Sequence, residues 1–214
     1  MVRKIKSPTR TISNRGQSPR FMGYFPCYKS DAGVLPFDSI PALDCGLYLE
    51  WRSDVMRIEF EPEKFEATDG ADRPAAIPDY RCTLDTGEIE VTEAKSSERA
   101  LRESERQQLH NSAEHCAYRG YQFRVVYRDE LHKNGFLDTI LLLRPFGWMT
   151  IPAATTEIAL ARLLVHEATT IEDWRRHAVA HRVPISVLYH LLYRQRLPLV
   201  YRRLLFTELL RWRV

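Results

Sequence analysis

The stretch IPDYRCTLDTGEIEVTEAK, residues 77–95, decides the expected fold. Its two halves, IPDYRCTL and EIEVTEAK, read as strands, and Asp85-Thr86-Gly87 joins them. An Asp-x-Gly joint between two such runs is typical of a β-hairpin. The stretch therefore predicts two antiparallel strands.

Upstream of this hairpin, the sequence predicts a helix followed by a strand. Apolar residues at helical spacing indicate a helix that includes residues 40–51, with Asp38 or Ser39 available as the N-cap and Pro41 in the first turn. Residues 55–60, VMRIEF, alternate enough to indicate a strand.

Downstream, SSERALRESERQQLHNSAEHCAYRG predicts one long helix that Ser97 caps and Gly120 ends. The run YQFRVVY, residues 121–127, predicts a further strand. A strand, a hairpin, a helix and a strand in this order predict an α/β fold, a mixed sheet with flanking helices.

The last third of the chain is expected to be mainly helical. Residues 129–144 look helical, and GWMTIPAATT indicates a domain joint. Three more helices are expected at residues 155–168, 170–182 and 184–196. A hairpin around Arg202 and Arg203 would complete a winged helix-turn-helix.

The composition is that of a globular protein, because 44% of the 214 residues are hydrophobic and 28% are charged. The net charge of +3 conceals segregation: residues 1–30 carry +7, residues 31–170 carry −10 and residues 171–214 carry +6. Clustered basic residues favour an anionic polymer such as DNA, although solvated basic surfaces are an equally good explanation.

Neither a disulfide framework nor a cysteine zinc site is expected. The four cysteines contain no Cys-x-x-Cys pair, so they indicate reduced thiols. No apolar run is long enough to cross a membrane, and no signal-peptide core follows the basic N-terminus. A cytoplasmic protein without membrane contact is expected.

Three charged side chains of the hairpin carry the expected chemistry. Period two places Glu93 and Lys95 on one face at the end of the second strand, and Asp79 lies on the first strand. Asp79 and Glu93 can share a hard cation such as Mg²⁺, with the Ala94 carbonyl nearby. The Lys95 ammonium would lower the pKa of a bound water or stabilise charge on a phosphate. This pattern suits phosphodiester hydrolysis.

A plainer alternative is that an exposed hairpin carries charged residues because surfaces are charged, and Glu-x-Lys alone is a common pattern. The combination is more specific. Asp79 follows a proline on one strand, Glu-x-Lys ends the next strand, and helices precede and follow. Together these features are the signature of the PD-(D/E)XK, or restriction-endonuclease-like, nuclease core.

A wider resemblance extends this signature. The runs YFPCYKSDAGVLPFDS, LYLEWRSDVMRIEFEP, IPDY, EVTEAK and YQFRVVYRDEL resemble the TnsA family, the endonuclease subunits of heteromeric bacterial transposases. TTIEDWRRHAVAHRVPISVLYHLLYRQRLPLVYRR resembles that family's C-terminal winged-helix domain. The expected organisation is a basic flexible arm at residues 1–23, a nuclease domain at 24–147 and a winged-helix domain at 153–214.

The resemblance implies a Mg²⁺-dependent DNA endonuclease, with Mn²⁺ as a substitute, that nicks the 5′ ends of a transposon during cut-and-paste transposition. It implies as partners transposon-end DNA, a DDE transposase (TnsB-like) that cuts and joins the 3′ ends, and an AAA+ ATPase regulator (TnsC-like). It assigns the metal-binding Asp to Asp79, the Glu or Gln position to Glu93 and the catalytic Lys to Lys95.

One position departs from the family pattern. Ser39 matches its Ser-x-x-Glu pattern on the first helix, but the expected Glu is Ala42. Asp38, one turn earlier on the same face, is the candidate substitute, whereas Asp44 faces elsewhere. An alternative is therefore a nuclease-weak or inactive assembly subunit that binds DNA and the ATPase. A standalone restriction-like nuclease is a further alternative.

The remaining candidate residues are arginines and histidines outside the hairpin. Arg194, Arg196, Arg202 and Arg203 are candidate DNA contacts around the expected recognition helix and wing, although that domain can equally contact the ATPase. The histidines are interpreted as solvent-facing or internally satisfied rather than as metal ligands, at positions His110, His115, His166, His177, His181 and His190.

Overall fold

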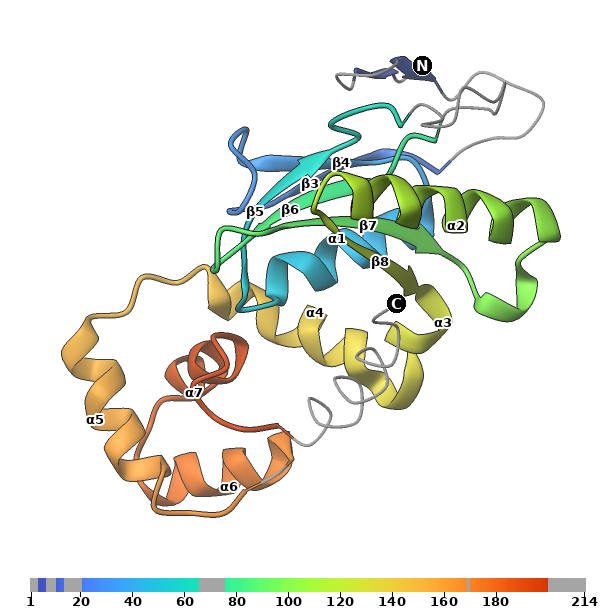
Figure 1. Cartoon of the computed structure of the whole chain (residues 1–214). Coiled ribbons are helices and arrows are strands. Elements are labelled where there is room, and N and C mark those ends of the chain that lie inside the picture. Colours follow the sequence, from blue (N-terminus) through green and yellow to red (C-terminus); the bar gives the residue numbers. More distant parts are fainter. Residues whose placement is uncertain (1–3, 7–10, 14–20, 66–75, 169, 200–214) are drawn as a thin grey trace. The chain divides into compact units, whose positions relative to one another are not determined.

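A computed structural model of the chain describes residues 4–6, 11–13, 21–65, 76–168 and 170–199 (Figure 1). The chain divides into two compact units, Met1–Leu131 and His132–Val214. The first unit has an α/β fold and contains the hairpin from which the expected site was derived. In the second unit the described residues form helices.

A mixed four-stranded sheet forms the centre of the first unit. Its strands are β5 (Val55–Phe60), β6 (Tyr80–Leu84), β7 (Ile89–Lys95) and β8 (Gln122–Tyr127), in the order β5-β6-β7-β8. β5, β6 and β7 are antiparallel neighbours, and β8 runs parallel to β7. These strands confirm the mixed sheet expected from the sequence.

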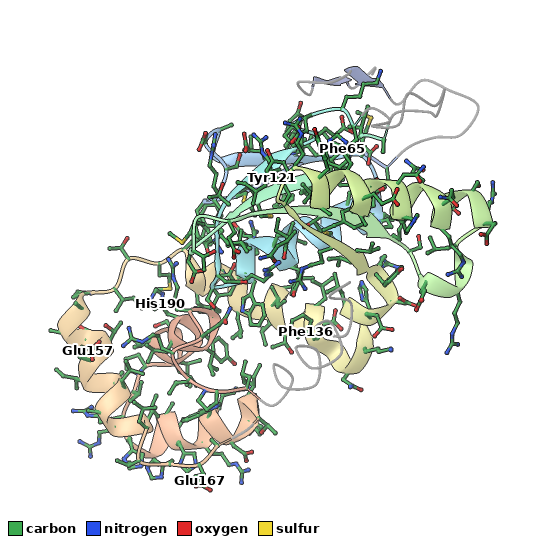
Figure 2. The ribbon with its side chains drawn as sticks, in the orientation of Figure 1. Phe65, Tyr121, Phe136, Glu157, Glu167 and His190 are labelled. Atoms are coloured by element: carbon green, nitrogen blue, oxygen red, sulfur yellow. The ribbon has the colours of Figure 1, made fainter. Side chains whose placement is uncertain are left out.

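Helices α1 (Ile40–Trp51) and α2 (Glu103–Tyr118) cover opposite faces of this sheet (Figure 1). On the α1 face, the Tyr80 hydroxyl donates to the Ala42 carbonyl at 2.9 Å. On the α2 face, a cluster formed by Phe65, Ala76, Val91 and Cys116 is buried, with Tyr121 packed against it (Figure 2). Burial of apolar surface on both faces fixes which residues point into each layer.

The N-terminus of α1 forms as expected. Ser39 is the N-cap, and its hydroxyl accepts a hydrogen bond from the Ala42 N–H at 3.2 Å. Pro41 lies in the first turn, where its missing N–H costs no hydrogen bond. Asp38 therefore lies immediately before the helix.

The prediction of a single helix after Lys95 is wrong. Ser97 caps only a short 3₁₀ turn, Glu98–Ala100, and α2 begins at Glu103. Residues 101 and 102 are extended, and the Glu105 side chain accepts the Arg102 N–H at 2.9 Å. This capping interaction starts a new helix. Gly120, with φ of +71°, follows the end of α2 as expected.

A buried ion-pair network joins the end of α1 to the sheet. The Arg52 guanidinium, 2% exposed, pairs with Glu90, 1% exposed, and also with Asp54 at 2.6 Å. Arg124 Nε donates to the same Glu90 carboxylate at 2.8 Å. Glu90 and Glu93 lie three positions apart on β7, so they point to opposite faces. The network is therefore a structural feature, separate from the expected site.

Two short pairs of antiparallel strands precede α1. β3 (Gly23–Pro26) pairs with β4 (Val34–Phe37), and β1 (Lys4–Lys6) pairs with β2 (Thr11–Ser13). The residues 1–23 that were expected to form a flexible arm thus contain a two-stranded ladder. Residues 66–75, between β5 and β6, lie outside the described residues.

The helix expected at residues 129–144 is broken. α3 (Arg128–Leu131) ends the first unit, a 3₁₀ turn covers Lys133–Gly135, and α4 (Phe136–Gly147) belongs to the second unit. Asn134 and Gly135 have φ of 54° and 69°, a left-handed backbone that interrupts a right-handed helix. This interruption lies next to the boundary between the two units, at Leu131/His132.

The second unit packs α4 with α5 (Ala153–Leu163), α6 (Ile171–Ala180) and α7 (Ile185–Tyr193). Trp174 and Leu188 are buried, and Gly147 of α4 lies against the ring of Tyr193. Thr170 caps α6, as expected, by accepting the Asp173 N–H at 3.1 Å. The expected wing around Arg202 and Arg203 lies outside the described residues.

No helix among the described residues is both long enough and apolar enough to cross a bilayer.

Candidate active site

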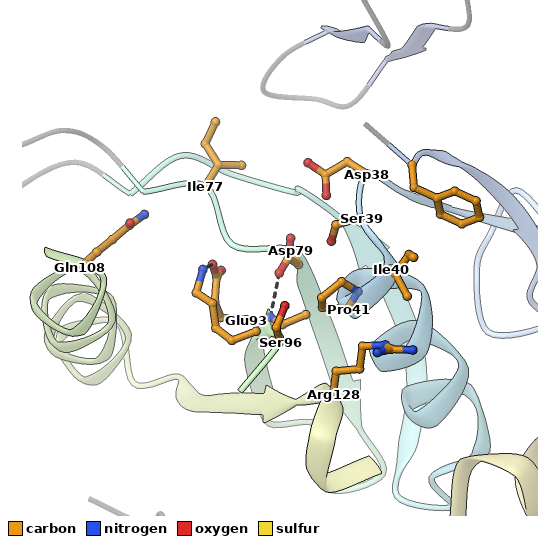
Figure 3. Close-up of a pocket in the computed structure, with 13 residues that line it drawn as sticks. Asp38, Ser39, Ile40, Pro41, Ile77, Asp79, Glu93, Ser96, Gln108 and Arg128 are labelled. Atoms are coloured by element: carbon orange, nitrogen blue, oxygen red, sulfur yellow. Dashed lines mark hydrogen bonds and ion pairs between the residues drawn. The ribbon is translucent and has the colours of Figure 1, made fainter. Parts of the chain in front are cut away.

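An open cleft of about 760 Å³ lies at one end of the sheet of the first unit (Figure 3). Its walls come from the N-terminus of α1, the residues before β6, the end of β7, and one residue each from α2 and α3. Asp38, Asp79, Glu93, Ala94 and Lys95 all line it. The structure therefore brings the predicted residues of the first unit to one place.

Asp79 and Glu93 lie side by side at the ends of neighbouring strands. Asp79 immediately precedes β6, not within it as expected, and the register pairs the next residue, Tyr80, with Thr92 of β7. The Ala94 N–H donates to Asp79 Oδ2 at 2.7 Å, which fixes the Asp79 carboxylate against β7. Hairpin pairing therefore brings the two acids together, and the Ala94 N–H orients Asp79.

The environment opposes ionisation of both carboxyls. Burial raises the pKa of Asp79 well above its usual range, and the negative charge of Glu93 raises it further, against the hydrogen bond from Ala94. Burial also raises the pKa of Glu93, and this effect exceeds the lowering by Lys95. Two like charges in a partly buried cleft are costly without a compensating cation.

Lys95 points to the same side as Glu93, as period two predicts. Its Nζ donates to Glu93 Oε1 at 2.7 Å, and the two side chains are 21% and 15% exposed. Burial lowers the pKa of Lys95, but the charges of Glu93 and Asp79 outweigh that effect, so its pKa is raised. Lys95 is therefore a fixed ammonium at neutral pH.

The start of α1 shows which residue can replace the Glu that the family pattern expects at Ala42. Ala42 is fully buried, so the position where the family resemblance expects Glu is closed by packing. Asp38 lines the cleft, and its charge raises the pKa values of both Asp79 and Glu93. Asp44 is turned away and pairs with Arg128 at 2.8 Å. Asp38 is thus the third acid of this cleft.

The oxygen donors in the cleft fit a hard divalent cation. Asp79 and Glu93 provide two adjacent carboxylates whose pKa values are raised by burial, and a cation between them would offset their repulsion. Within the described residues, one group of three potential ligand atoms lies within 4.8 Å, and it is elsewhere in the chain. Asp38 therefore neighbours the pair without closing a cage of three carboxylates.

Two cleft residues were not identified from the sequence. Gln108 of α2 and Arg128 of α3 line the cleft (Figure 3), and the Arg128 guanidinium is held by Asp44 of α1. Arg128 directly follows β8, whose parallel pairing with β7 brings it to the strand end that carries Lys95. The position of Arg128 directly after the predicted strand at residues 121–127 was the sequence signal that could have identified it. The position of Gln108 at the cleft could not be predicted, because the sequence did not indicate that α2 begins at Glu103.

The candidate DNA contacts of the second unit lie at the end of α7. Arg194 is its C-cap, and Arg196 is exposed and pairs with Glu157 of α5 at 3.2 Å. Arg202 and Arg203 lie outside the described residues. The structure thus places two of the four arginines on one stretch of surface.

Neither the family models nor the curated proteins contain a match to this chain.

Proposed function

We propose that this chain is a divalent-cation-dependent DNA endonuclease with a PD-(D/E)XK-type core. The observation that carries the proposal is the convergence of Asp79, Glu93 and Lys95 in one cleft at the end of a mixed sheet. The strand order and the helices on both faces are compatible with such a core. The resemblance to the TnsA family then makes a transposase subunit that nicks 5′ transposon ends the specific form of the proposal.

In this proposal Asp79 and Glu93, together with the Ala94 carbonyl, hold Mg²⁺ or Mn²⁺. When bound, the cation supplies Lewis-acid activation of the phosphate and lowers the pKa of its water. Asp79 is held in place by the Ala94 N–H, and Glu93 is held by Lys95, so both carboxylates are oriented before substrate arrives. This preorganisation is the protein's main contribution.

Lys95 acts electrostatically rather than as a base. Its raised pKa keeps the ammonium charged, so at neutral pH it does not accept a proton from water. A positive charge beside the carboxylate pair stabilises the negative charge that develops on phosphate oxygens. The N-terminus of α1 also lines the cleft, and its partial positive charge adds attraction for phosphate.

The second unit is proposed to be a winged-helix-like module that contacts DNA or the ATPase regulator. The buried core of its helices and the exposed arginines at the end of α7 support a binding role. The partners in this proposal are transposon-end DNA, a TnsB-like DDE transposase and a TnsC-like AAA+ ATPase, acting in the cytoplasm.

A second candidate is an assembly subunit with little or no nuclease activity, favoured by the buried Ala42 at the position of the missing acid. It predicts binding to end DNA and to the ATPase without cleavage. A standalone restriction-like nuclease remains a third candidate, and a gene neighbourhood without a transposase and an ATPase would favour it.

The test is strand cleavage of DNA carrying the transposon ends, with the neighbouring transposase and Mg²⁺. We expect 5′ nicks from the wild type and from Asp85→Asn, an exposed turn variant, but not from Asp79→Asn. Equal cleavage by wild type and Asp79→Asn would refute the site. Binding without cleavage by the wild type would favour the assembly subunit.

A further inference from the structure

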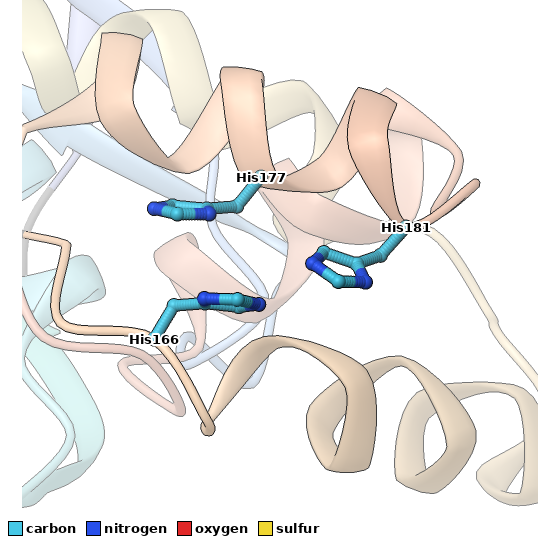
Figure 4. Close-up of side chains that lie close together, drawn as sticks. All are labelled: His166, His177 and His181. Atoms are coloured by element: carbon cyan, nitrogen blue, oxygen red, sulfur yellow. The ribbon is translucent and has the colours of Figure 1, made fainter.

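The second unit brings together three histidines that sequence reasoning interpreted as unrelated. His177 lies on α6, His181 is the C-cap of the same helix, and His166 lies on the turn that follows α5 (Figure 4). One ring nitrogen from each lies within 4.8 Å of the others. Their spacing in the sequence hid this convergence, because His166 comes from a separate element.

The arrangement has the features of a chelating site. His177 and His181 are four residues apart, which places both rings on one side of a helix. The His166 ring faces both of them, with ring centroids 4.2 Å from His177 and 4.5 Å from His181. The three side chains are partly exposed, so an ion can reach them from solvent.

Ordinary packing leaves one polar atom of this cluster unexplained. His166 Nε2 is buried and has no hydrogen-bond partner, and buried polar atoms are usually paired. A basic side chain also lies beside the cluster, because the Arg162 guanidinium donates to the His181 carbonyl at 3.4 Å. The C-terminal end of α6 contributes a partial negative charge that favours a cation.

We propose that His166, His177 and His181 form a Zn²⁺ site that fastens the turn after α5 to the end of α6. Neutral imidazole is a preferred ligand of Zn²⁺, and three histidines leave a fourth position for water. Tetrahedral coordination at about 2.0 Å places ligand nitrogens roughly 3.4 Å apart. The rings of His166 and His177 are stacked with their planes 15° apart, so both must rotate to direct a nitrogen at one ion. This site is independent of the carboxylate cleft in the first unit.

The test is metal binding to the tag-free full chain after removal of metals with EDTA. Zn²⁺ titration by calorimetry and Co²⁺ titration by visible absorption are performed with millimolar Mg²⁺ present, which competes for the carboxylate cleft. We expect one Zn²⁺ per chain, a rise in Tm, and Co²⁺ bands typical of nitrogen ligands. His177→Ala and His166→Gln should each weaken binding at least about tenfold.

The matched control is His110→Ala, an exposed histidine of the first unit that pairs with Glu114. This variant and Asp79→Asn should bind Zn²⁺ as the wild type does. Each variant's metal-free Tm and circular dichroism show whether it is folded. Changes in the NMR chemical shifts of the wild-type imidazole protons on addition of Zn²⁺ identify the ligands directly. No binding by the wild type, unperturbed shifts of the three histidines, or equal binding by His177→Ala would overturn the proposal.

Discussion

Replacing Asp79 by asparagine should stabilise the protein while removing its response to Mg²⁺. The substitution keeps the shape of the side chain, and the amide oxygen can still accept the Ala94 N–H. It removes a negative charge whose pKa is raised by burial and by Glu93. Functional sites often hold such unfavourable charges, and relieving one contributes about 0.5–2 kcal/mol to the free energy of unfolding.

The sign of the pH dependence follows from the raised pKa. The neutral Asp79 carboxyl favours the folded state, and this contribution is lost as pH rises through the folded-state pKa. Above that pKa the wild type carries an unfavourable carboxylate that the variant lacks. The stability gain of Asp79→Asn should therefore be largest at neutral pH and above, and should disappear at low pH.

Thermal unfolding between pH 4 and pH 8 measures this effect. For a chain of this length, 1 kcal/mol corresponds to about 2–4 °C in Tm. Mg²⁺ should raise the Tm of the wild type but not that of Asp79→Asn. Asp31→Asn is the control, because hydrogen bonding to Arg57 lowers the pKa of this exposed carboxylate, so no gain is expected. A lower Tm for Asp79→Asn at neutral pH, or an unchanged Mg²⁺ response, would refute the reasoning.

Three further substitutions test other parts of the structure. Ala42→Glu should cost about 1–3 kcal/mol in denaturant unfolding, because the position is fully buried, and should not increase cleavage; enhanced cleavage would show that the family's acid is accommodated there. Arg52→Met should cost about 3–5 kcal/mol by the same measurement, because Glu90 loses a buried partner; a cost below about 1 kcal/mol would contradict this. Gly147→Ala should lower the Tm of the second unit, because the added methyl collides with the Tyr193 ring, and a Tm equal to that of the wild type would show that α4 and α7 pack differently.

The sequence predicted the elements whose signals are local. The Asp-x-Gly joint at residues 85–87 indicated the hairpin, and Ser39 with Pro41 indicated the start of α1. Because strand period and register follow from the hairpin, the proximity of Asp79, Glu93 and Lys95 could also be predicted. The interruption before α2 was not predicted, because the extended residues there are Leu101 and Arg102 and not the glycine or proline that would indicate a break.

The missed features depend on contacts between distant parts of the chain. His166 and His177 belong to different elements, and only the packing of the second unit brings their rings to 4.2 Å. Arg128 enters the cleft because α3 follows β8, and burial of Ala42 is visible only once α1 packs on the sheet. Sequence periodicity describes one element at a time, so it does not report these approaches.

The most direct test of the nuclease proposal is the rate of DNA strand cleavage by wild type and Lys95→Met at saturating Mg²⁺. Loss of the ammonium beside Glu93 should lower the rate about 10²–10³-fold, the size expected for one electrostatic stabiliser of the transition state. Lys64→Met, at an exposed lysine of the same unit, is the matched control and should cleave as the wild type does. Equal rates for wild type and Lys95→Met would contradict the assigned site.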